Sequence, residues 1–221
     1  MRRKAGVVCM LLGVCLMLGA LGLLAYNRWD DIRAGQDAED TLNALKEAME
    51  ASENGDGTAD KTDEDETDET DETDTESENV HGSEMDTIEI DGYEYIGTLS
   101  IPDISLELPV MAEWSYKGLK KAPGLYSGSV WTDDMVICGH NYQRHFGNLK
   151  YLEEGAAVVF TDVSGNVFNY RVAEVGILKP TAVDEMLDRE TEDWDLTLFT
   201  CTVGGRTRVT VRCMRTDESE S

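Results

Sequence analysis

Hydrophobic and polar positions divide the chain into parts with different patterns. Residues 5–25 form an apolar run without a charged side chain, long enough to cross a bilayer as one helix. Residues 53–87 contain almost no apolar side chains, whereas residues 88–215 alternate short apolar runs with polar turns. We therefore expect an anchor, a spacer and one compact domain, followed by a polar tail at 216–221.

The compact domain has the pattern of short β-strands. Val163-Ser164-Gly165-Asn166 predicts a hairpin turn, and residues 183–187 predict one helical turn within the long loop 180–194. Many short strands with few helices favour an all-β fold, a closed β-barrel of about eight strands with short helical turns in its loops. The strand-like runs lie at 95–101, 106–111, 135–138, 156–161, 167–178, 196–201 and 207–214.

Apolar residues recur at helical intervals between the apolar run and the spacer. Ala38, Leu42, Leu45 and Met49 predict an amphipathic juxtamembrane helix within residues 26–52. Because the apolar stripe is narrow, a plain stalk is the favoured interpretation. A helix lying near the membrane and a weak self-association surface are the alternatives.

Residues 53–87 hold most of the net negative charge of the chain. The net charge is −26, and residues 53–86 carry 16 acidic side chains against Lys61 alone. Such a segment cannot bury enough apolar surface to offset the entropy of ordering, so we expect a disordered, self-repelling spacer. Binding of divalent cations is the alternative to a plain linker. We expect no nucleic-acid partner.

The flanks of residues 5–25 predict an orientation in the membrane. The tip at 1–4 carries three basic residues, and positive charge stays cytoplasmic, so the chain after Tyr26 is expected outside. A cleaved signal peptide is the alternative. The run exceeds the usual length of a signal peptide's apolar region, and the small residues near Gly19 and Ala20 form only a weak cleavage site. We therefore expect an uncleaved signal anchor and a single-pass protein of the cell membrane with an extracytoplasmic domain.

Two β-branched runs flank Gly204-Gly205 and predict a tight β-hairpin. If these glycines are the turn residues, Cys201 lies opposite Arg208 on the next strand. Cross-strand partners are about 5 Å apart, so the guanidinium can favour a thiolate or bind an oxyanion formed on a substrate. A buried strand cysteine beside a solvated arginine is the ordinary alternative.

Two other arginines share the strand parity of Arg208. Arg206 lies at the turn, and Arg212 falls opposite Thr197, so Arg208 is the favoured partner of Cys201. A longer turn or a β-bulge would change this choice.

A histidine follows the apolar run 135–138. His140 comes directly after Gly139, where a buried strand is expected to end. Imidazole titrates near neutral pH, so it can protonate a leaving amine and deprotonate an incoming nucleophile. Cys201, His140 and Arg208 thus form a candidate catalytic set.

These motifs resemble those of the sortase family. Thr197-Leu198-Phe199-Thr200-Cys201 matches in full the T-L-x-T-C motif of that family, which also has an arginine on the next strand and a G-H pair after an earlier one. Further agreement lies at 95–102, 108–110 and 208–212, and the resemblance covers residues 88–215. It implies a sortase-type β-barrel and a catalytic domain over that range.

The resemblance also implies a reaction. Cys201 would attack a backbone carbonyl in the cell-wall sorting signal of a secreted protein and form a thioester. An amine of peptidoglycan or of a pilin would then accept the acyl group. Arg208 would stabilise the oxyanion, and His140 would act as acid and base. No cofactor is needed; some relatives bind calcium near the groove, but no site is identifiable in this sequence.

Two features indicate which kind of sortase the chain resembles. No Asp-Pro-aromatic lid motif precedes Tyr95, and no apolar span follows Arg215. Both count against a pilin-polymerising enzyme and favour one that anchors proteins to peptidoglycan on a Gram-positive-type surface. A cysteine hydrolase that releases the acyl group to water and a non-catalytic, tethered binding domain remain the alternatives. Substrate-binding residues cannot be identified.

The remaining cysteines and histidines have simpler interpretations. Two of five cysteines lie in the apolar run, and Cys138 and Cys213 are expected to be small buried residues without a bridge. A metal site using Cys138, His140, His145 and Cys201 lacks the usual ligand spacing, so none is expected. His145 is expected to be a loop or packing residue.

Overall fold

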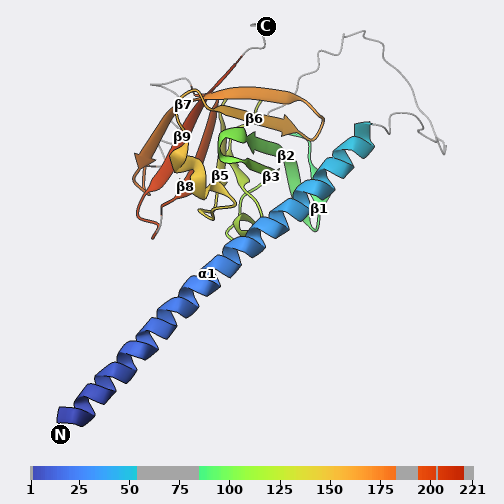
Figure 1. Cartoon of the computed structure of the whole chain (residues 1–221). Coiled ribbons are helices and arrows are strands. Elements are labelled where there is room, and N and C mark those ends of the chain that lie inside the picture. Colours follow the sequence, from blue (N-terminus) through green and yellow to red (C-terminus); the bar gives the residue numbers. More distant parts are fainter. Residues whose placement is uncertain (1, 54–84, 183–193, 203, 217–221) are drawn as a thin grey trace, which may run out of the picture.

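The computed structural model describes residues 2–53, 85–182, 194–202 and 204–216. The spacer expected at 53–87 lies outside these residues except at its two ends, as does the helical turn expected at 183–187. Of the tail at 216–221, only its first residue is described. Figure 1 shows one long helix with a barrel of strands against its carboxy-terminal half.

Nine strands form one sheet among the described residues, in the order β1-β2-β3-β4-β5-β8-β9-β7-β6. They are β1 (Ile88–Ile90), β2 (Tyr93–Ile101), β3 (Leu106–Met111), β4 (Gly124–Ser127), β5 (Met135–Gly139), β6 (Ala157–Asp162), β7 (Val167–Leu178), β8 (Leu196–Cys201) and β9 (Arg208–Arg215).

The sheet closes on itself because β2 pairs with both β3 and β6. Gly97 on β2 permits the close approach to β6, since a Cβ there would lie 2.1 Å from the carbonyl oxygen of Thr161. The ring contains β2 to β9, and β1 adds a hairpin strand to β2 outside it. The expected closed barrel of eight strands is therefore confirmed. Most pairs are antiparallel, but β3 runs parallel to β4 and β5 runs parallel to β8.

Apolar side chains fill the barrel interior. Strand residues alternate between the two faces, and the inward ones, such as Leu99, Ile137, Phe160 and Leu198, are completely buried. Short 3₁₀ helices lie in the loops, as expected: η1 (Pro102–Ile104), η2 (Gly118–Lys120) and η3 (Phe146–Tyr151).

Six of the seven expected strands begin and end within one residue of the expected positions. β2 begins two residues early, at Tyr93, and the expected β6–β7 turn is confirmed by the pairing of Thr161 with Val167.

The sequence analysis missed β1 and β4. Asp91-Gly92 between β1 and β2 is a hairpin signal, and both residues have positive φ, 51° and 76°. β4 has only four residues and one pairing partner on β3, which leaves no alternation to detect.

One continuous helix, α1 (Arg2–Glu53), contains both the apolar run and the amphipathic segment. The favoured interpretation of the amphipathic segment as a free stalk is wrong, because Ala38, Leu42 and Leu45 are buried. Ala38 and Leu45 belong to the apolar clusters of the barrel. Docking of α1 on the barrel buries the narrow apolar stripe that the sequence shows.

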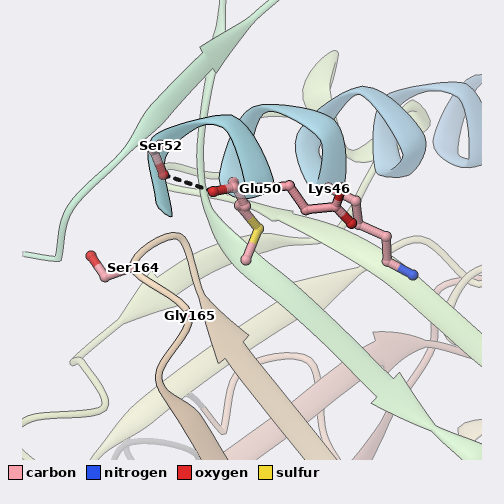
Figure 2. Close-up of a pocket in the computed structure, with 6 residues that line it drawn as sticks. Lys46, Glu50, Ser52, Ser164 and Gly165 are labelled. Atoms are coloured by element: carbon pink, nitrogen blue, oxygen red, sulfur yellow. Dashed lines mark hydrogen bonds between the residues drawn. The ribbon is translucent and has the colours of Figure 1, made fainter. Parts of the chain in front are cut away.

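The described residues on either side of 54–84 contact the same body. At the end of α1, Met49 packs against the cluster formed by Leu45, Tyr95 and their neighbours. On the other side of the gap, Met85 is buried in the barrel core and Asp86 accepts a hydrogen bond from Ser164 Oγ (3.1 Å). Figure 2 shows the last turns of α1 beside the β6–β7 turn.

Candidate active site

His140, Cys201 and Arg208 fall in one row across three neighbouring strands. The parallel pairing of β5 with β8 sets Gly139 beside Thr200, so the next residues along each strand are His140 and Cys201. Thr200 Oγ1 donates a hydrogen bond to the Gly139 carbonyl (2.8 Å) and fixes the two strand ends together. On the other side of β8, Cys201 pairs with Arg208.

The predicted hairpin register is confirmed. Cys201 pairs with Arg208 and Thr197 pairs with Arg212, as the Gly204-Gly205 turn requires. Both glycines have positive φ, 83° and 69°, which explains glycine at these positions. The same count places Val203 opposite Arg206, but Val203 lies outside the described residues.

The candidate row lies on the outer face of the barrel. Leu198 on β8 points into the core, so by alternation Phe199 and Cys201 face outward. Phe199 and Cys138 belong to a separate outer apolar cluster with Val136, against which Trp114, Leu119, Tyr126 and Leu178 pack. The thiol is half-buried, next to an aromatic surface.

The surroundings of His140 favour its neutral form. Burial lowers its pKa from the ordinary value, and the charge of Lys120 on η2 lowers it further. Asp30 of α1 and a hydrogen bond with the Asn141 side chain act in the opposite direction. A neutral imidazole can accept a proton from a neighbouring thiol.

Of the three arginines considered, only Arg208 lies in the row with Cys201. Its Nη1 donates to the carbonyls of Gly205 and Thr207 (3.3 Å each), which holds the side chain against the hairpin loop. Arg212 is buried and donates to Thr197 Oγ1 (2.8 Å), and Arg206 is exposed at the turn.

The two other cysteines of the barrel lie outside the row with His140 and Arg208. Cys138 and Cys213 are both buried and unbridged, as expected, and burial raises the pKa of each to about 12. Within the described ranges, no group of three or more metal-ligating side chains occurs. His145 is fully buried against α1, which confirms a packing role.

The pocket in Figure 2 lies between α1 and the β6–β7 turn, away from this row. Its lining contains no cysteine or histidine, and Lys46 there forms an ion pair with Glu107. This pocket therefore offers neither a thiol nor an imidazole for acyl transfer.

Two residues beside His140 were missed by the sequence analysis. The ring of Tyr142 stacks on the imidazole, with centroids 4.7 Å apart, and its hydroxyl donates to Asp30 Oδ2 (2.7 Å). Asp30 lies 112 residues earlier in the chain, so no local pattern connects it with the site.

A thiol, an imidazole and a guanidinium in one row define a candidate site for cysteine-dependent acyl transfer. The family model of the Sortase domain matches residues 99–216, more than half of the chain. The chain therefore belongs to the sortase family.

Curated relatives are similar over this same part of the chain. Sortase A of Bacillus anthracis is 26% identical over 124 residues, which cover 54% of this chain and 58% of the relative. Sortase A of Streptococcus agalactiae serotype III (strain NEM316) is 28% identical over 122 residues, covering 48% and 47%. The chain thus spans about half the length of these relatives.

Solved structures share the barrel. Sortase A from Corynebacterium diphtheriae superposes with a TM-score of 0.52 at 26% identity, covering 58% of this chain and 64% of that one. Sortase C1 from Streptococcus suis gives 0.50 at 28% identity, with coverages of 57% and 74%. A sortase A structure and a sortase C structure are therefore both similar to this chain.

Proposed function

We propose that this protein is a membrane-anchored cysteine transpeptidase that attaches secreted proteins to the cell wall. The observation that carries the proposal is the row of His140, Cys201 and Arg208 across β5, β8 and β9. Membership of the sortase family supports a peptidoglycan amine as the acceptor.

The first half-reaction forms a thioester. His140, neutral because burial lowers its pKa, takes the proton of the Cys201 thiol as Sγ bonds to the scissile carbonyl carbon of the sorting signal. Negative charge develops on the carbonyl oxygen, where the fixed guanidinium of Arg208 stabilises it. The C–N bond then breaks, and the imidazolium of His140 donates its proton to the departing amine.

The second half-reaction resolves the thioester and regenerates the free enzyme. The acceptor amine attacks the thioester carbonyl, His140 takes the proton of the incoming nitrogen, and the C–S bond breaks to restore the thiol. Neither half-reaction requires a cofactor.

Anchoring is supported by the amino-terminal part of α1. One helix in the described part of the chain is long and apolar enough to cross a membrane. Its apolar side chains Leu12, Leu18 and Leu24 are about two-thirds exposed, although Leu45 on the same helix is buried. We propose residues 5–25 as a single-pass anchor with the barrel outside the cell, as the basic residues at 2–4 favour.

The test is mass spectrometry of the full chain incubated with sorting-signal peptides and a glycine peptide as the amine. We expect an acyl-enzyme on Cys201 and a product that contains the glycine peptide. Cys201→Ala abolishes both, and Cys138→Ala, a buried cysteine on the neighbouring strand, serves as the matched control that keeps both. Acylation without amine incorporation would indicate a hydrolase, and an unreactive Cys201 would indicate a binding domain.

A further inference from the structure

The loop that follows His140 is held by α1. Gln143 N–H donates to Asp31 Oδ1 (2.7 Å), and Tyr142 OH donates to Asp30 Oδ2 (2.7 Å). One turn further along the helix, the imidazole Nε2 of His145 lies 3.3 Å from the carbonyl oxygen of Ala34. Three residues of one short loop thus contact successive positions on the same helix.

Small residues on α1 permit this close approach. Ala34 is buried, and a Cβ added at Gly35 would lie 2.0 Å from Cδ of Arg144. Any larger residue at Gly35 would displace the Arg144 side chain. The helix face and the loop are therefore fitted to each other by shape as well as by hydrogen bonds.

Tyr142 connects this helix contact with the catalytic row. Its ring lies on the imidazole of His140 at an interplanar angle of 27°, and its edge meets His145 at 5.5 Å between centroids. The hydroxyl points to Asp30, so one side chain contacts both α1 and His140. A shift of α1 at Asp30 would move the ring that supports the imidazole.

We propose that Asp30 and Tyr142 are positioning residues for His140, so that the helix carrying the anchor also completes the acid/base site. The proposal rests on the proposed function for the role of His140 in turnover, but the contact itself does not. The two residues do not touch the substrate; they act through the imidazole.

Charges around His140 give this arrangement a measurable consequence. Lys120 lowers the pKa of the imidazole and Asp30 raises it, so the aspartate offsets the lysine. Asp30 thereby stabilises the imidazolium that must protonate the leaving amine. The groups that face His140 from the surrounding elements are Lys120 on η2, Asp30 on α1, Cys201 on β8 with Arg208 beyond it on β9, and Asn141, Tyr142 and His145 on its own loop.

The experiment uses the full chain in lipid nanodiscs with two readouts, the NMR titration of the His140 imidazole and steady-state transpeptidation against pH. Asp30→Asn removes the charge but keeps an acceptor for Tyr142, so the His140 titration and the acidic limb of kcat move to lower pH. Asp30 stabilises the imidazolium form of this general acid, and general acid–base catalysis is worth about 100-fold or more, so removal of the charge lowers kcat about tenfold with KM little changed. Asp40→Asn, the same change at an exposed site on α1, is the matched control.

Variants at Tyr142 separate the ring from the hydroxyl. Tyr142→Phe keeps the stacked ring and retains most of kcat, whereas Tyr142→Leu loses about tenfold. An unchanged His140 titration in Asp30→Asn, or equal kcat in Tyr142→Leu and the parent, overturns the positioning role. If the parent chain fails to transfer peptides while the Asp30→Asn titration still shifts, the proposed function fails and the coupling of Asp30 to His140 stands.

Discussion

Three arginines lie near Cys201 in the sequence, and their geometry separates them. Arg212 donates a hydrogen bond to Thr197 within the sheet, and Arg206 is exposed at the hairpin turn. Arg208 alone pairs with Cys201, and the loop carbonyls of Gly205 and Thr207 orient its guanidinium. A planar fork held in this way presents donors in fixed directions.

At this scale we predict that Arg208→Lys is severely impaired although the charge is kept. An ammonium cannot satisfy the loop carbonyls and an oxyanion with the same geometry, and loss of one oxyanion donor costs about 100-fold or more. Single-turnover acylation measures the effect, with Arg206→Lys as the matched control. A crippled Arg206→Lys beside an active Arg208→Lys would contradict the assignment of the oxyanion donor.

The pairing of Cys201 with Arg208 could be predicted because strand register is arithmetic, whereas the place of His140 in the row depends on the parallel pairing of β5 with β8. Once the glycine turn is located, pairing follows by counting, and Cys201 opposite Arg208 requires no knowledge of the fold. The contact of Asp30 with Tyr142 could not be predicted, since it depends on where a distant helix docks. Phe199 likewise appears in the sequence only as an apolar strand residue, without any sign of its aromatic neighbours.

Among the elements, most strands could be predicted from alternation, whereas the docking of α1 could not. An apolar stripe predicts a helix with one buried face but does not identify the surface that covers it. The barrel supplies that surface through Ile88, Ile90 and Met111, which belong to strands remote in the sequence.

The loop between β5 and η3 gives the docking of α1 a pH dependence. His145 is fully buried against Ala34, and burial lowers its pKa to about 4 from 6.5. Because the folded state binds this proton less readily than the unfolded state, stability is present above pH 6.5 and is lost as pH falls toward 4. We predict a fall in the free energy of unfolding of up to about 3 kcal/mol across this window.

Thermal unfolding from pH 7 to pH 4 measures this loss, in comparison with His145→Leu, which removes the titrating group. Carboxylates titrate in both proteins, so only the difference between the two pH profiles reports His145. His81→Gln, in the acidic segment outside the described residues, is the control that keeps the parent profile. Identical profiles for the parent and His145→Leu would contradict the prediction.

For the whole molecule, α1 sets the distance between the barrel and the proposed membrane boundary. Asp30 lies only five positions after Ala25, about 7.5 Å along a helix axis. The acidic segment therefore adds no reach between the membrane and the active site, contrary to what its position in the sequence suggests. It joins the end of α1 to β1 on a body that both already contact.

Because of this topology, we expect that a cut within the acidic segment leaves the barrel attached to α1. A protease site introduced between residues 54 and 84 would yield two pieces, and we predict that the barrel piece sediments with membranes because the docked face of α1 still holds it. Ala38→Glu with Leu45→Glu places two charges in that face, and the same cut should then release the barrel into the supernatant. Release from the parent chain on cutting would mean that the covalent connection alone retains it. Proteolytic nicking within this segment would thus leave a two-piece protein in which α1 and the barrel stay together.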